Sequence, residues 1–295
     1  MLFETPPPKP TLRERLDPWR PTLRYCMQTE VHVYAFSMAA NILLSFFPFL
    51  IVMVSLCRYA LEWQLAEQAV YLALRDYFPD PLGAFLQRNL RFTVDSRGPF
   101  QVVSVLLLLF TANGIFEPLE VALNRAWGIA TNRSYFRNQL VSLGLILASG
   151  GLALTSTVFT AFNQQLWQQL FGKPEVTGAA AATFVGLAFF KMAAVPLSIL
   201  MLFLVYWLLP NGKVPALRIL PAAAVVGVAL EALKYVNLLS WPWLRAKLER
   251  EYGPFVYSVT IVLWGFLASM VVLAGAEWAA RSGGRDSLQS TGASR

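Results

Sequence analysis

The stretch from residue 219 to residue 239, ILPAAAVVGVALEALKYVNLL, decides how this chain folds. It is long and apolar enough to form a helix that crosses the hydrocarbon core of a bilayer, which takes about 20 residues. Two ionisable residues, Glu231 and Lys234, interrupt it. Such groups are costly at membrane depth and usually face a bundle interior or a water-filled cavity. Because they are three positions apart, they lie on one helix face and can pair.

The composition of the whole chain is that of an integral membrane protein. Of the 295 residues, 56% are hydrophobic and 14% are charged, and the mean hydropathy is +0.51. Soluble domains carry about 25% charged residues. The net charge of +7 comes from basic residues between apolar runs, where they set topology and meet anionic lipid headgroups. No basic stripe with interleaved aromatic residues is present, so we expect membrane lipids and no nucleic acid as partners.

The apolar runs predict an all-α, polytopic fold with six transmembrane helices. We expect a cytoplasmic segment with an interfacial helix over residues 1–32, a membrane domain over 33–279 and a disordered cytoplasmic tail over 280–295. Between the first two spans, helical spacing predicts amphipathic helices over Leu61–Phe78 and around Leu82–Phe92. The six spans are expected near Val33–Cys57, Phe100–Leu123, Leu140–Phe162, Ala180–Leu209, Ile219–Leu239 and Phe255–Ala279.

The loop after the second span predicts the orientation. It holds Arg125, Arg133 and Arg137 and no acidic residue. Short loops rich in Lys and Arg stay on the cytoplasmic side of the membrane. We therefore expect both termini in the cytoplasm, with the three arginines contacting anionic headgroups.

A second group of polar residues lies at the end of the second span. Asn113, Glu117, Glu120 and Asn124 follow one another at separations of four, three and four, so they project from one helix face. Together with Glu231 and Lys234, they are our candidate substrate- or proton-binding residues, in one polar layer between spans two and five. The alternative is that these charges only hold helices together, a contribution of roughly 0.6–2 kcal/mol for each pair.

The sequence indicates no enzyme chemistry and no cofactor. Cys26, Cys57 and His32 have no metal-ligand spacing, and no phosphate-binding loop or nucleophile elbow is present. A hydrolase that uses Glu117 and Glu120 as paired acids is a third hypothesis, but it would need water and substrate at membrane depth.

Several segments together resemble the YihY/BrkB family of bacterial inner-membrane proteins. They are AFSMAANILLSFFP at Ala35–Pro48, LNRAWG at Leu123–Gly128 followed by Arg133 and the pair Phe136–Arg137, Leu209–Asn211, Tyr252–Gly253, Leu263–Trp264 and GAE at Gly275–Glu277. The chain departs from the family's pattern after Trp264, where Gly265 and Phe266 stand instead of Tyr. The resemblance covers roughly Tyr25 to Trp278.

The resemblance implies six spans, cytoplasmic termini and an inner-membrane location, but no settled activity. Some members carry a ribonuclease label and others a virulence-factor label. The ribonuclease label suits this chain poorly, because the sequence shows no metal-ligand cluster and no soluble catalytic domain. We expect a transporter or flippase of a lipid or small solute. The alternative is a non-transporting scaffold for envelope assembly.

Overall fold

The computed structural model describes residues 20–77, 81–96, 99–130, 133–171 and 194–292, and within these ranges it contains helices and no strand. The α-helices are α2 (Arg20–Cys26), α3 (Thr29–Ser55), α4 (Gln64–Tyr77), α5 (Pro81–Asp95), α6 (Pro99–Ala126), α7 (Tyr135–Phe171), α9 (Ala194–Leu208), α10 (Ala216–Tyr252) and α11 (Val256–Gly292). A π-helical turn η1 (Leu56–Ala60) follows α3, and a 3₁₀ turn η2 (Gly253–Phe255) joins α10 to α11.

Four helical stretches in the described residues are long and apolar enough to cross a bilayer, judged by length and composition. Helices suit that environment because every backbone amide finds its partner within the segment. The stretches are Thr29–Ala60, Phe136–Thr155, Ala216–Asn237 and Leu239–Arg281. The chain is thus an all-α protein with membrane-spanning character, and the count of six spans stays a prediction.

The remaining expected spans are only partly described. Helix α6 covers the second one, whereas α9 covers only the second half of the fourth, and residues 172–193 lie outside the described part. Helix α10 continues well past Leu239, the end we predicted for the fifth span. Helix α11 continues to Gly292, where we expected a disordered tail from residue 280. The apolar pattern marks the part of a helix inside lipid, and the hydrogen-bonded backbone runs on beyond it.

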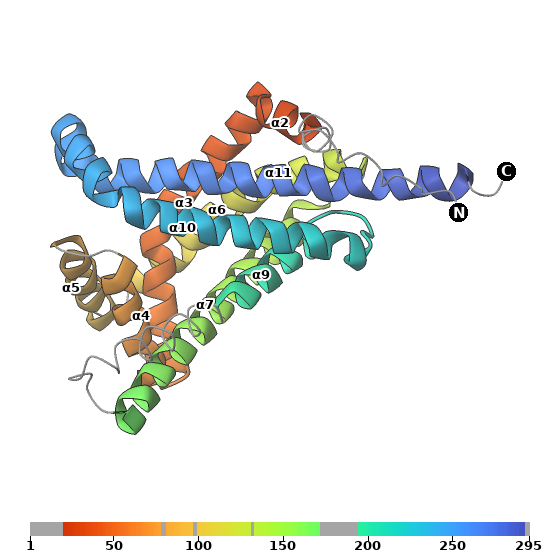
Figure 1. The fold of residues 1–295 in the computed structure, drawn as a ribbon. Helices are drawn as coiled ribbons and strands as arrows, with labels where there is room; N and C mark the ends of the chain where they lie inside the picture. The colour runs from red at the N-terminus through yellow and green to blue at the C-terminus, as the bar shows by residue number, and fades with distance from the viewer. Residues whose placement is uncertain (1–19, 78–80, 97–98, 131–132, 172–193, 293–295) are drawn as a thin grey trace, which may run out of the picture.

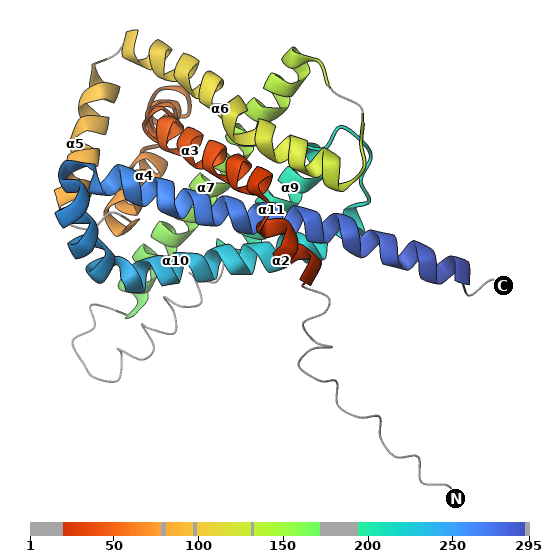
Figure 2. The same cartoon turned by 90° about the horizontal axis from the view of Figure 1, so that it is seen from above.

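The helices pack in a chain of neighbours around one large core. Helix α3 packs on α6 and α11, α11 on α10, α10 on α9, and α9 on α7 (Figures 1 and 2). Helix α2 lies against α11. Tyr206 of α9 is fully buried in this core, and its hydroxyl donates to the carbonyl of Val272 in α11 at 2.6 Å.

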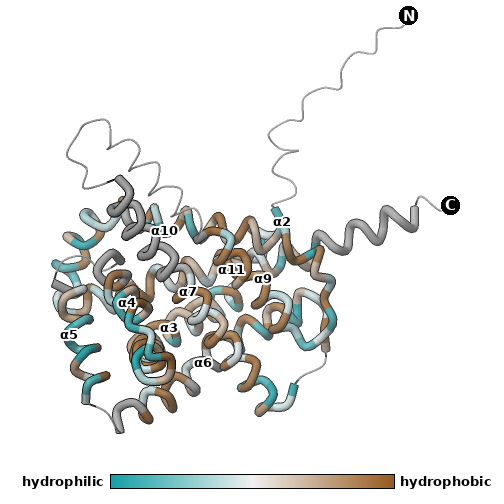
Figure 3. Tube along the Cα trace, turned by 90° about the horizontal axis from the view of Figure 1, so that it is seen from below, coloured by the Kyte–Doolittle hydropathy of each residue, from teal (hydrophilic) through white to brown (hydrophobic). Residues whose placement is uncertain are grey.

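A second, smaller core forms where α4 and α5 fold against the end of α3. Figure 3 shows hydrophilic residues gathered on α4 and α5, in contrast to the hydrophobic course of α3. Their apolar sides bury Leu74, Leu90 and Val94 against Val54 and Cys57. The two amphipathic helices predicted between the first two spans are thereby confirmed, with Pro81 at the start of the second.

Candidate functional site

Glu231 and Lys234 form an ion pair on α10, as their spacing predicted. Lys234 Nζ also lies 5.3 Å from the centre of the Tyr235 ring. The Glu231 side chain is 17% exposed and the Lys234 side chain 34% exposed. The pair is therefore neutral as a unit and lies in neither a dry core nor open solvent.

The pair lies deep along its helix. Glu231 is twelve residues beyond Ile219, which is about 18 Å at the rise of an α-helix, and the hydrocarbon core is about 30 Å thick. One turn earlier, Gly227 packs so closely on α9 that a Cβ there would come within 2.7 Å of Ile199 Cγ1. Glu231 follows Gly227 by four residues and so lies on the same side of α10.

A second polar site joins two loops at the far end of α6. The Asn124 side-chain oxygen accepts a hydrogen bond from the backbone N–H of Asn211 at 2.9 Å. The guanidinium of Arg133 donates to the carbonyls of Leu208 and Pro210, at 3.0 and 2.6 Å. These residues, which we call the loop clamp, tie the connection between α6 and α7 to the end of α9.

Glu120 lies one turn before Asn124, on the same face of α6, and is only 7% exposed. Its Oε2 atom and the Arg133 Nη1 atom are both buried without a hydrogen-bond partner within the described residues. Burial lowers the pKa of Arg133, and the negative charge of Glu120 acts against that shift. The loop clamp thus keeps one acceptor and one donor that water or a polar ligand can satisfy.

Two further polar contacts lie near helix ends. Arg125 pairs with Glu30 at the start of α3. Thr22 of α2 donates to Glu277 Oε2 at 2.7 Å and accepts from Arg281 at 2.7 Å, while Arg281 also pairs with Glu277 at 3.0 Å. Through these contacts Glu277 docks α2 on α11.

The structure does not join the two candidate groups into one polar layer. Helix α6 packs on α3, α7 and α11, whereas α10 packs on α9 and α11, so spans two and five have at most marginal contact in the described residues. Glu117 and Arg137 are exposed, in contrast to Glu120, and the side chain of Asn113 lies outside the described part. Hydropathy reports how deep a residue lies along a helix but not which helix it faces, and this is why the predicted layer fails.

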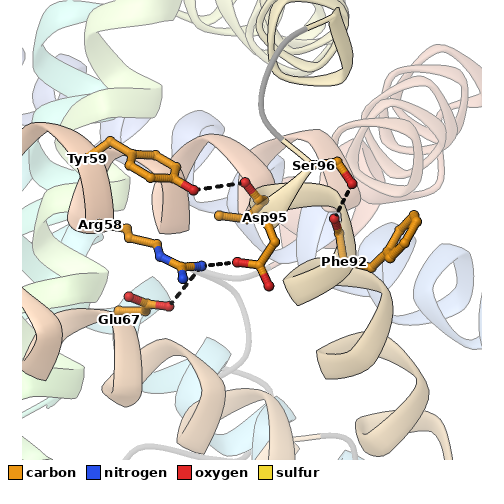
Figure 4. Close-up of polar contacts among 7 residues, drawn as sticks. Arg58, Tyr59, Glu67, Phe92, Asp95 and Ser96 are labelled. Atoms are coloured by element: carbon orange, nitrogen blue, oxygen red, sulfur yellow. Dashed lines mark hydrogen bonds and ion pairs between the residues drawn. The ribbon is translucent and has the colours of Figure 1, made fainter.

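Another polar network, which our sequence analysis did not single out, holds α4 and α5 to the end of α3 (Figure 4). Arg58 pairs with Asp95 of α5 and lies 3.9 Å from Glu67 of α4, and the Tyr59 hydroxyl donates to the Val94 carbonyl at 3.1 Å. Two of the three contacts, Arg58 with Asp95 and Tyr59 with Val94, join residues 37 and 35 positions apart in the chain. The network serves to fix the two amphipathic helices.

No group of three His, Cys, Asp or Glu side chains is placed to hold a metal ion in the part of the chain that the structure describes. Cys26 and Cys57 are free thiols.

Comparison with known proteins adds a family to this geometry. The family described as "Virulence factor BrkB" matches residues 22–293, nearly the whole chain. The chain belongs to the BrkB family. Among BrkB relatives, it is 27% identical to a UPF0761 membrane protein of Acinetobacter baylyi over 72% of its own length and 48% of the relative's. It is 26% identical to a UPF0761 membrane protein of Laribacter hongkongensis, over 86% of its own length and 58% of the relative's.

The chain therefore spans about half the length of these two relatives. A Bacillus subtilis protein, YfkH, whose name carries a ribonuclease-like label, is 24% identical over 80% of this chain and 84% of its own. No solved structure matches the chain. The relatives' names and the apolar helices together make this chain a membrane protein of the BrkB family.

Two of the segments that carried the BrkB resemblance, LNRAWG with Arg133 and Leu209–Asn211, meet in space. Leu123–Gly128, Arg133 and Leu209–Asn211 all contribute to the loop clamp. In the GAE segment, Gly275 lies against Val226 of α10 so closely that a Cβ would overlap Val226 Cγ2 and approach the Tyr206 hydroxyl to 2.8 Å. The family pattern thus records inter-helix contacts of the bundle.

Proposed function

We propose that this BrkB-family protein moves a lipid or small solute across a membrane, with Glu231 and Lys234 as its polar binding site. One observation carries the proposal: a half-exposed ion pair lies deep along a membrane-spanning helix. Ionisable residues at that depth usually mark substrate, ion or proton pathways. The proposal gives the chain no hydrolytic activity and no cofactor.

The partial exposure of the pair favours a binding role over simple glue. Two charges that only hold helices together gain most when they are well packed and their remaining hydrogen-bonding capacity is satisfied by protein. Lys234 keeps about a third of its side chain exposed. A ligand headgroup or an ion has room to contact it without first opening a dry interface.

We also propose that the protein lies in the bacterial inner membrane with both termini in the cytoplasm. The docking of α2 on α11 through Thr22 and Glu277 brings the two ends of the described chain to one side of the bundle. In a Cys57→Ser background, Cys26 is expected to resist a membrane-impermeant maleimide in spheroplasts and to react after permeabilisation. Equal labelling of Cys26 before and after permeabilisation would indicate the opposite orientation.

Flux into liposomes tests the transport function. The purified protein is reconstituted with a mixture of phospholipids labelled with a fluorophore on the acyl chain, and dithionite bleaching reports movement between leaflets. Glu231→Gln and Lys234→Met are expected to lower the rate by about tenfold, the usual value of a lost charge-assisted hydrogen bond. Arg88→Gln, an exposed charge on α5 and outside the site, is the matched control. Unchanged flux in both variants would remove the pair from the mechanism.

The alternative function is a membrane scaffold for envelope assembly. The self-neutralised pairing of Glu231 with Lys234 favours it, because a paired charge needs no ligand. A double variant separates the two functions. If Glu231→Lys combined with Lys234→Glu restores thermal stability but not flux, the pair acts on a substrate. If no labelled lipid moves faster than in protein-free liposomes, the scaffold is favoured.

A further inference from the structure

Helix α10 carries a second ion pair on the same side as the first. Arg245 Nε lies 3.8 Å from Glu249 Oε2. Arg245 follows Glu231 by fourteen residues, and Glu249 follows it by eighteen. Both separations are close to a whole number of helical turns. The two pairs therefore lie in line, about 21 Å apart along the helix axis.

Between the two pairs, α10 carries Asn237 and Trp241. Trp241 stacks on Tyr257 of α11 with ring centres 6.3 Å apart. The Trp241 Nε1 and Asn237 Oδ1 atoms are buried and have no hydrogen-bond partner within the described residues. A donor and an acceptor are thus left open between the ion pairs. We call Glu231, Lys234, Trp241, Arg245 and Glu249 the polar side of α10.

A different side of the same helix is apolar and exposed. Leu239 is 82% exposed and Trp243 68%, and they follow each other by four residues. Exposed apolar and aromatic side chains on a membrane-spanning helix are typical of contact with lipid, with Trp enriched near the headgroups. The polar side of α10 therefore lies next to a surface suited to acyl chains.

We infer that the polar side of α10 binds a phospholipid with a zwitterionic headgroup, one that carries both an ammonium and a phosphate. This rests on the proposed transport function and names its substrate class. Each pair offers a carboxylate for the ammonium and a Lys or Arg for the phosphate, while the acyl chains stay along Leu239 and Trp243. Arg245 and Glu249, whose side chains are 26% and 60% exposed, form the outer headgroup-binding site. Glu231 and Lys234 form the deep one.

The charge balance explains why a zwitterion suits the site better than an anionic lipid. When an ammonium and a phosphate separate the two members of a pair, both protein charges keep a partner. An anionic headgroup engages Lys234 and leaves the Glu231 carboxylate uncompensated at membrane depth, which is costly. Selectivity then comes from the penalty on the wrong headgroup.

Headgroup selectivity in liposomes tests the inference. Phosphatidylethanolamine and phosphatidylglycerol, each labelled on the acyl chain, are compared in separate preparations of the full chain. We expect phosphatidylethanolamine to cross about tenfold faster, and soluble phosphoethanolamine to leave the rate unchanged because it lacks the acyl contacts. Arg245→Gln with Glu249→Gln is expected to reduce this preference. Arg88→Gln, an exposed cation on α5 and outside the proposed site, is the matched control.

The outcomes separate the inference from the transport function. If neither lipid moves above the protein-free rate, the transport function fails. Three outcomes refute the zwitterion site while transport stands. Both lipids move at one rate, phosphatidylglycerol is preferred, or the Arg245 and Glu249 substitutions change the preference no more than Arg88→Gln does. If soluble phosphoethanolamine is itself taken up or inhibits, the ligand is a free solute and the lipid site is refuted. Thermal unfolding of each variant in detergent confirms that a loss of flux is not a loss of fold.

Discussion

Asn124 accepts a hydrogen bond from the backbone N–H of Asn211, although 87 positions separate the two residues in the chain. The contact closes the loop clamp, in which Arg133 donates to the carbonyls at the end of α9. Because Asn124 is only 7% exposed, its side of this hydrogen bond is shielded from water.

Asn124→Ala is therefore expected to destabilise the protein by about 1 kcal/mol, the net contribution of one hydrogen bond. Thermal unfolding in detergent measures this loss. Asn89→Ala is a suitable control, because Asn89 donates only to a carbonyl of its own helix turn, that of Phe85. An equal shift in both variants would argue against the clamp.

Arg133→Lys tests whether the geometry or the charge of this arginine matters. Lysine keeps the positive charge but lacks the planar guanidinium, whose Nη2 atom donates to both carbonyls. We expect a loss of roughly 1–2 kcal/mol, comparable to one or two hydrogen bonds to a charged donor. The same change at the exposed Arg137 should be nearly neutral. If Arg133→Lys unfolds at the temperature of the parent, headgroup attraction alone explains the residue.

Gly275→Ala is expected to destabilise the contact between α10 and α11. The added methyl would overlap Val226 Cγ2, and overpacking of this kind costs about 1–3 kcal/mol. Val226→Ala in the same chain should recover part of the loss by making room.

Gly144→Ala provides the opposite control. A Cβ at Gly144 in α7 meets nothing within 4 Å, so the same change should stabilise its helix by about 0.5–1 kcal/mol. Unfolding temperatures that fall equally for both glycines would contradict the close approach at Gly275.

The reactivity of Cys26 reports the docking of α2 on α11. Burial, and then the negative charge of Glu277, raise the pKa of the Cys26 thiol. A raised pKa favours the protonated thiol, so the reactive thiolate is scarcer at pH 8 than in an ordinary cysteine. In the Cys57→Ser background, maleimide labelling should reach half of its maximal rate at a higher pH than labelling of an ordinary cysteine does.

Glu277→Gln removes the charge and should move that labelling profile to lower pH. The burial of Cys26 remains, so the shift should be partial. Glu251→Gln, which leaves Glu277 in place, serves as the control. If Glu277→Gln leaves the pH dependence of Cys26 labelling unchanged, α2 does not dock beside this carboxylate.

Much of this molecule follows from local sequence. Apolar runs place the long helices, and the spacing of three residues places Glu231 beside Lys234, because both depend only on the geometry of one helix. The amphipathic pattern after the first span likewise predicts α4 and α5. Local pattern also predicts where a helix enters lipid, but less well where it ends, as the lengths of α10 and α11 show.

What only the tertiary structure decided is which helix faces which. Glu117 and Glu120 share a face of α6 by spacing, yet one is exposed and the other is buried beside the loop clamp. Spans two and five, expected to share a polar layer, pack on different neighbours. The period of a helix limits the direction in which a side chain points. Which residue that side chain then meets depends on contacts between segments far apart in sequence, such as the one between Asn124 and Asn211. Such contacts form only when the helices pack into a bundle.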